Sequence, residues 1–206
     1  MKILRIDMST LTSSFEDLPE EWKILGGRGL SAKILTAEVP PETEPLSAEA
    51  RLVLANGPLA GTMAPSFGRM SVGAKSPLTM GIKEANVGGS VAQKLDKLGI
   101  RVIVIQGAPA DGKLHLVRIT NEGVSIEDAE AYRGMGTYPL SDALRKEYGK
   151  KVGIVSIGIV GERMKKSASV ALTDKDGDPS RHAARGGLGA VMGAKGIKAI
   201  VADDKG

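Results

Sequence analysis

Short hydrophobic runs, mostly of strand length, alternate along the chain with turns rich in glycine and proline. Residues 101–106 (RVIVIQ) are almost all aliphatic and β-branched, which indicates a buried strand. Residues 69–74 (RMSVGA) alternate in the way a strand with one covered face does. Further strands are predicted at 2–8, 51–55, 113–120, 124–126, 151–157, 167–172 and 198–202. The pattern therefore predicts eight or more strands.

Helical patterns are fewer and short. They cover residues 20–25, 29–36, 90–98, 128–132 and 140–148, and a further helix is expected after Arg185. Ala110-Asp111-Gly112 predicts a hairpin that joins 101–106 to 113–120, and Asn121-Glu122-Gly123 predicts a second tight turn. Residues 9–14 are interpreted as a polar turn.

The predicted fold class is α+β, with largely antiparallel sheets and a few short helices. Tight turns between neighbouring strands favour antiparallel pairing over a regular βαβ series. No repeat of 20–50 residues is visible. Two glycine-flanked helices, after Asn86 and after Arg185, indicate a distant internal duplication.

Composition narrows the possible functions. The 206 residues suit a single domain, and 27 of them are glycine, nearly twice the usual share of about 7%. The formal net charge of +4 is scattered and aromatic residues make up only 3%, so no nucleic-acid partner is expected. Cysteine is absent, which excludes disulfides, zinc–thiolate sites and cysteine-bound iron–sulfur clusters within these residues.

The N-terminal residues lack an apolar segment followed by a cleavage site, so no signal peptide is predicted. No apolar run approaches the ~18 residues that cross a membrane. We therefore expect a soluble, cytoplasmic protein without a membrane partner.

Standard catalytic and ligand-binding motifs fail in this sequence. Met192 stands at the last glycine position of a dinucleotide fingerprint, and Gly193-Ala194-Lys195-Gly196 lacks the end of a Walker A loop. The acidic run from Asp174 to Asp178 resembles a calcium loop, but Pro179 occupies the glycine position. His115 and His182 have no carboxylate or histidine at a metal-binding spacing, and His115 is expected to be structural. No catalytic residue is predicted.

Arginines beside glycine-rich turns remain as candidate ligand contacts. They are Arg28 in GGRGL, Arg69 in FGRMSV and Arg185 in RGGLG, and Asn86 in ANVGG joins them. The guanidinium fork matches phosphate oxygens and the polar edges of planar rings. The densest glycine stretch, 185–195 (RGGLGAVMGAK), fits either an anion cradle at a helix start or tight packing of that helix on a sheet. Together these residues favour a site for a large phosphorylated cofactor.

The order of motifs along the whole chain resembles one family. The matching blocks are GGRGL, ANGPLAGT, GRMSVGAKSPLT, ANVGG, RVIVIQG, IGIVGE and RGGLGAVMGAKGIKAI. This series is similar to the N-terminal domain of the tungsten-containing aldehyde ferredoxin oxidoreductase family, from about residue 2 to residue 202. The resemblance implies a base of two β-sheets under a tungsten or molybdenum ion held by the dithiolenes of two molybdopterins, with Mg²⁺ bridging their phosphates.

The resemblance also implies roles for particular residues. Arg69, Asn86 and Gly88 would contact the pterin cofactor, and so would Arg185, Gly186, Gly187 and Gly189 in a second loop. The backbone carbonyls of Asn86 and Gly186 would be the magnesium ligands. Because the dithiolene sulfurs hold the metal, the absence of cysteine agrees with this role.

Members of this family continue into further domains that carry a 4Fe-4S cluster and the acid–base residues. The resemblance therefore implies one domain, residues 1–206, of an enzyme that oxidises aldehydes to carboxylates and passes electrons to ferredoxin. Its partners would be the remaining domains or a subunit. Alone it is expected to be inactive and open to homo-oligomer formation. The alternatives are a non-catalytic domain that binds phosphorylated ligands or assembles with a partner, and a nucleotide-binding oxidoreductase.

Overall fold

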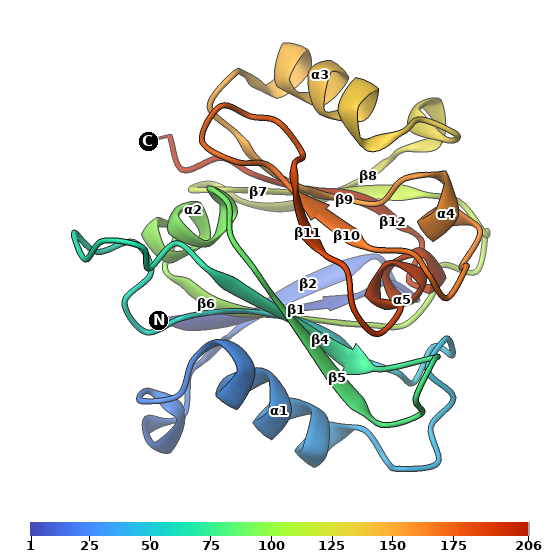
Figure 1. Ribbon diagram of the computed structural model, residues 1–206, viewed down its shortest axis with the longest axis horizontal. Helices are drawn as coiled ribbons and strands as arrows, with labels where there is room; N and C mark the ends of the chain where they lie inside the picture. The colour runs from blue at the N-terminus through green and yellow to red at the C-terminus, as the bar shows by residue number, and fades with distance from the viewer. Residues whose placement is uncertain (206) are drawn as a thin grey trace.

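Two six-stranded sheets lie face to face in the computed structural model, which describes residues 1–205 (Figure 1). The first sheet and its helices comprise β1 (Lys2–Asp7), β2 (Thr12–Asp17), η1 (Glu20–Trp22), α1 (Gly27–Glu38), β3 (Leu52–Asn56), β4 (Met70–Lys75), β5 (Ile82–Val87), α2 (Val91–Lys97) and β6 (Ile100–Gln106). The second comprises β7 (His115–Thr120), β8 (Gly123–Asp128), η2 (Glu130–Tyr132), α3 (Thr137–Tyr148), β9 (Gly153–Ser156), α4 (Ile159–Glu162), β10 (Val170–Leu172), β11 (Arg181–Ala183), α5 (Leu188–Ala194) and β12 (Ile197–Ala202).

The strand order is the same in both sheets. The first sheet runs β2-β1-β6-β3-β4-β5, and the second, taken from its other edge, runs β8-β7-β12-β9-β10-β11. Only β1–β6 and β7–β12 are parallel pairs; the other paired strands of the two sheets are antiparallel. The predicted α+β class with largely antiparallel sheets is confirmed.

Three hydrophobic clusters divide the structure into layers. The largest lies between the sheets and includes Ile103 of β6 and Ile200 of β12. The outer face of the first sheet packs on α1, and the outer face of the second packs on α3, so these helices lie on opposite sides of the molecule (Figure 1). Because both faces of the central strands are covered, β6 is hydrophobic at nearly every position. No helix within residues 1–205 is long and apolar enough to cross a membrane.

The order of elements repeats in the two sheets, which agrees with the internal duplication indicated by the sequence. Helices α2 and α5 occupy equivalent places, each just before the central strand of its sheet. Both strands begin after a glycine with positive φ, Gly99 at 76° and Gly196 at 64°. We call residues 1–106 the first half and residues 115–202 the second half.

The sequence pattern does not predict three of the strands. The edge strand β2 is exposed at every residue, so residues 12–14 are strand and the polar turn predicted there is wrong. Edge strand β5 and the short β11 likewise lack a hydrophobic alternation. In the second half, β8 extends to Asp128, and only Glu130–Tyr132 is helical within the segment predicted as a helix.

The predicted hairpin at Ala110-Asp111-Gly112 is also wrong. The turn forms, since the Lys113 amide donates to the Asp111 carboxylate at 3.0 Å. However, the strand before it belongs to the first sheet and the strand after it to the second. Turn chemistry is local and does not determine which sheet the next strand joins.

Candidate functional site

Edge strand β5 of the first sheet packs against edge strand β11 of the second (Figure 1). A cleft lies at this junction. Its volume is about 630 Å³. The lining comes from both halves: Ser66, Gly68, Arg69 and 86–89 on one side, and Asp174, Lys175, Asp176 and Ser180–His182 on the other. The cleft is therefore formed by the repeat itself, at the junction of two equivalent edges.

Arg69 and Asn86 form one wall of the cleft. Arg69 precedes β4, and its Nε donates to Asn86 Oδ1 while its Nη2 donates to the Asn86 backbone oxygen at 3.3 Å. Both residues are exposed in the structure, so the guanidinium is oriented without being covered. A Cβ at Gly88 would meet only Arg69 Nη1, at 3.6 Å, so packing does not require glycine there. The missing side chain instead leaves this wall open.

The opposite wall contains residues that sequence reasoning did not assign to the site. Asp174 closes its turn by accepting from the Asp176 and Asp178 amides and, at 2.7 Å, from the Ser180 hydroxyl. The Ser180 hydrogen bond is the main reason that the pKa of Asp174 lies below its usual value. The acidic run thus builds a turn, and the turn carries Arg181 and His182 into the cleft.

The sequence does not assign Arg181 and His182 to the site because β11 has no hydrophobic pattern. In the structure, His182 Nδ1 lies 3.0 Å from the Ser169 hydroxyl of the neighbouring loop. Arg181 adds a second guanidinium to the cleft that already contains Arg69. The sequence signal that could have assigned them to the site is their position, a few residues before the glycine run that begins at Gly186.

A smaller cavity of about 320 Å³ adjoins the cleft and shares Asn86 and His182 with it. Its other lining residues are Arg28, Glu84, Ala85, Ala184 and Arg185. Arg185 therefore lies beside the cleft and not within it. Arg28, the third arginine singled out by the sequence, reaches the same cavity from the start of α1 and donates from Nε to Glu84 Oε2 at 3.1 Å.

The glycines after Arg185 serve the packing of α5. Gly186 and Gly187 have positive φ, 79° and 71°, and Gly187 caps the helix in the left-handed conformation. A Cβ at Gly189 would collide with the Ser169 carbonyl oxygen. These three residues do not line the cleft or the adjoining cavity. The sequence offers two interpretations of this stretch, an anion cradle and tight packing of the helix on a sheet. The collision at Gly189 is direct support for tight packing.

Each of the two carbonyls proposed for magnesium already accepts a hydrogen bond from a side chain. The Gly186 oxygen accepts from the Ser76 hydroxyl at 2.8 Å, and the Asn86 oxygen accepts from Arg69. A carbonyl oxygen has a second lone pair, so the magnesium role stays a prediction. Residues 1–205 contain no cluster of three or more His, Cys, Asp or Glu side chains that could hold a metal.

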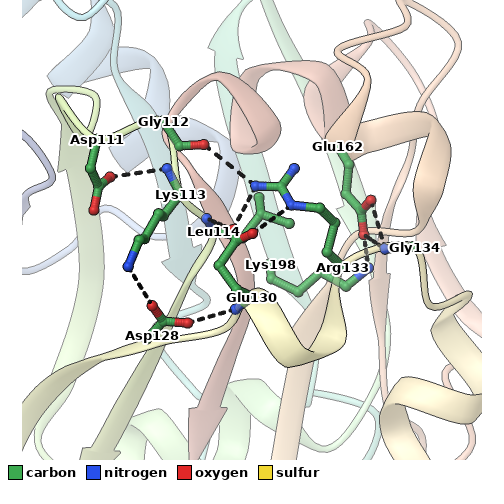
Figure 2. Close-up of polar contacts among 10 residues, drawn as sticks. All are labelled: Asp111, Gly112, Lys113, Leu114, Asp128, Glu130, Arg133, Gly134, Glu162 and Lys198. Carbon is green, nitrogen blue, oxygen red and sulfur yellow. Dashed lines mark hydrogen bonds and ion pairs between the residues drawn. The ribbon is translucent and has the colours of Figure 1, made fainter.

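A second polar cluster, away from the cleft, is drawn in Figure 2. Arg133 forms a two-point ion pair with Glu130 at 2.8 and 2.5 Å and, with the Leu114 amide, lowers the pKa of Glu130 to about 2. Lys198 is fully buried and donates to Glu162 and to the Met135 carbonyl. Burial lowers the pKa of Lys198. These contacts join the turn after η2 to α4 and β12 and so hold the second half together.

The sequence matches the family model described as "Aldehyde ferredoxin oxidoreductase, N-terminal domain" over residues 3–204. The chain belongs to this family. It is 40% identical to a tungsten-containing aldehyde ferredoxin oxidoreductase of Pyrococcus furiosus over 98% of this chain and 33% of that protein. It is 31% identical to the WOR-like subunit of an aliphatic sulfonate oxidoreductase from the same organism, over 100% of this chain and 34% of that protein.

Among solved structures, the fold is similar to a chain of the active-site complex BamBC of benzoyl coenzyme A reductase, in complex with 1,5-dienoyl-CoA. The TM-score is 0.91 at 33% identity, covering 98% of this chain and 30% of that one. The chain thus spans about a third of the length of the relatives that it matches. The relatives that this chain matches are therefore named for different reactions, and these homologues are oxidoreductases.

Proposed function

We propose that this domain holds a tungsten or molybdenum bis-molybdopterin cofactor in an enzyme that oxidises aldehydes to carboxylates. The relatives named for tungsten support the choice of cofactor. The observation that carries the proposal is the cleft itself, where Arg69 is oriented by Asn86 and faces a wall that carries Arg181.

The residues of the cleft suit such a group. Guanidinium forks at Arg69 and Arg181 match phosphate oxygens and the heteroatom edges of pterin rings. The open wall at Gly88 lets a ligand approach the backbone. When bound, the metal centre would supply the two-electron redox chemistry. The residues of this chain would bind and orient the cofactor, and Asn86 and Gly186 would offer carbonyl oxygens to Mg²⁺.

Aldehyde as substrate and ferredoxin as electron acceptor, through a 4Fe-4S cluster in further domains, are part of the same proposal. The relatives of 38–42% identity are aldehyde ferredoxin oxidoreductases, which favours this reaction over the sulfonate and benzoyl-CoA reactions named for the others. No residue of this domain is assigned an acid–base role in the reaction. We therefore expect the domain alone to be inactive.

The test measures cofactor content after expression of the chain together with the domains that complete the enzyme. We expect tungsten or molybdenum with about two pterins per metal, as implied by the family. Arg69→Ala should lower pterin and metal content several-fold, because it removes the oriented guanidinium. Arg163→Ala, at an exposed arginine outside the cleft, is the matched control and should leave both unchanged.

A purified complex free of metal and pterin would overturn the proposal and favour a non-catalytic domain that binds phosphorylated ligands or assembles partners. Saturable binding of NAD or NADP would favour the nucleotide-dependent alternative. A large fall in melting temperature for Arg69→Ala alone would show that this residue maintains the fold.

A further inference from the structure

An exposed loop without charged side chains joins β3 to β4. This β3–β4 loop, residues 57–68, reads GPLAGTMAPSFG. The Met63 side chain is 100% exposed, and Leu59 and Phe67 are 44% and 45% exposed. Single exposed hydrophobic residues are ordinary, but three of them on one uncharged loop are typical of a surface that another protein covers.

The equivalent loop of the second half has a different composition. Strand β9 takes the place of β3 in the strand order, so the counterpart is the β9–β10 loop, residues 157–169. Its exposed apolar side chains, such as Met164 at 46%, lie beside the exposed charges of Lys165 and Lys166. Interspersed charges are the usual composition of a surface that faces water. The uncharged surface therefore belongs to the first half and is not required by the repeat.

The β3–β4 loop is fixed at both ends. At its start, the Gly57 carbonyl accepts a hydrogen bond from Arg101. A Cβ at Gly61 would collide with the Asp96 carboxylate, so the loop packs directly on α2. At its end, Gly68 lines the cleft. Because the ends are held, the loop presents its apolar side chains at a defined place beside the cleft.

The polypeptide that follows this domain in the relatives begins beside the same helix. The chain matches 33% and 34% of the length of two relatives, and the family model describes an N-terminal domain. Asp204, which follows β12, is held on α2 by Lys94 at 2.6 Å and by Lys97 at 3.1 Å. Figure 1 shows the segment after β12 and α2 on the same side of the molecule. A further domain connected there has the β3–β4 loop within immediate reach.

We infer that the β3–β4 loop is the docking surface for the polypeptide that completes the enzyme, with Leu59, Met63 and Phe67 buried against apolar side chains of that partner. Methionine and aromatic residues are enriched in the buried centres of interfaces. The partner then borders the cleft at Gly68 and covers it from that side. The choice of partner rests on the proposed function, in which this chain is one domain of a larger oxidoreductase.

The experiment uses the complex of this chain with the domains that complete the enzyme, purified after co-expression. Light scattering over a dilution series measures its dissociation constant. Met63→Asp should raise this constant at least about ten- to hundredfold, the range for burial of one large apolar side chain. Met164→Asp, at the exposed methionine of the equivalent loop, is the matched control and should leave the constant unchanged. Both variants should keep the melting temperature of the isolated chain.

A second measurement covers the case in which the separate polypeptides do not associate. The completing domains are then joined to this chain in one polypeptide, and amide hydrogen exchange is compared with that of the isolated chain. Amides of residues 57–68 should exchange at least about tenfold more slowly in the joined protein.

Unchanged exchange of residues 57–68, or an unchanged dissociation constant for Met63→Asp, would overturn the inference. An equal loss of affinity for Met164→Asp would also overturn it, as would a dimer of the isolated chain that Met63→Asp converts to monomers, because the loop would then bind a second copy. A complex without metal and pterin that Met63→Asp still weakens would refute only the proposed function. A metal-loaded complex that Met63→Asp does not weaken would refute only the docking surface.

Discussion

The two halves of the molecule build equivalent strand pairs at the cleft from different residues. The register places Met70 opposite Val87 in the first half and Val170 opposite Ala183 in the second. Arg69 in the first half thus corresponds to Ser169 in the second, and Asn86 corresponds to His182. Each pair is hydrogen-bonded, Arg69 to Asn86 and Ser169 to His182. The backbone design is repeated, but only the first half places an arginine at this position.

The halves also differ in how they fix a buried cation. The second residue of the central strand is basic in both, Arg101 in β6 and Lys198 in β12. Arg101 donates to the Gly57 carbonyl and lies 3.9 Å from Asp96, whereas Lys198 pairs directly with Glu162 of α4. Each basic residue therefore anchors the loop after the neighbouring strand, and only the second half folds that loop into a helix. Both halves therefore have a basic residue at the same position of the central strand, but the groups that this residue binds differ.

Lys198→Met should give the largest loss of stability. It leaves the Glu162 carboxylate, 6% exposed, without its cation, and breaking a buried ion pair from one side costs about 3–5 kcal/mol. Urea unfolding monitored by circular dichroism measures the change. The double variant Lys198→Met/Glu162→Leu should recover much of the loss, because it removes both charges. A cost below about 1 kcal/mol for the single variant would contradict a buried ion pair.

Lys195 tests the comparison of the two halves through the pH dependence of stability. It occupies the C-cap of α5, where the first half has Leu98, and its buried Nζ donates to the Ser47 and Ala48 carbonyls at 2.7 and 3.0 Å. Burial lowers its pKa from 10.5 to about 8. Between these values the unfolded chain binds more protons than the folded one, so stability rises with pH in that window.

The free energy of unfolding of the wild type, minus that of Lys195→Met, should therefore rise between pH 8 and pH 10.5. The rise is at most about 3 kcal/mol, because the two carbonyls favour the ammonium. Guanidinium chloride unfolding at several pH values measures the difference. A flat difference would mean that hydrogen bonds to Ser47 and Ala48 offset the effect of burial on Lys195.

Glu130 tests a smaller difference between the halves, in an ion pair at the surface. The first half has the pair Glu20–Lys23 where the second has Glu130–Arg133. Of the two glutamates, only Glu130 also accepts from a backbone amide, that of Leu114 just before β7. Its folded pKa of about 2 lies below the ordinary value of 4.5, mainly because of Arg133. Its stabilising effect is therefore complete above pH 4.5 and is lost as pH falls toward 2.

The stability difference between wild type and Glu130→Gln should shrink over this acid range in thermal unfolding. As a control at neutral pH, Lys23→Ala should lower the melting temperature less than Arg133→Ala does. The reverse order would contradict the two-point geometry at Glu130.

The sequence predicts the covered strands well and the edges poorly. The run at 101–106 signals a strand because neighbours on both faces require apolar side chains. Strands β2 and β5 form through backbone hydrogen bonds at sheet edges, which impose little on their side chains. The hairpin predicted at residue 111 failed because which sheet a strand joins depends on contacts far away in the chain.

The same limits apply to the site. The glycine-rich turns around Arg69 and Asn86 made them candidates, and the family resemblance added Gly88. The structure brings these three residues to one wall. Arg181 and His182 face them only because β10 pairs with β11 and the two sheet edges meet, an arrangement that no local pattern encodes. Gly187 and Gly189 are a different case, since packing explains their glycines and their ligand-binding role stays a prediction.

The parallel pairs β1–β6 and β7–β12 have a consequence for how such a molecule could arise. Lys2 lies beside Ile100 and Asp7 beside Gln106, so the chain enters the first half at one end of its central strands and leaves at the other. Residues 107–114 then carry it into the second half, where β7 and β12 run in the same manner. A unit that passes the chain onward in this way can be joined head to tail by gene duplication, with a short connector and without a change in its own strand order.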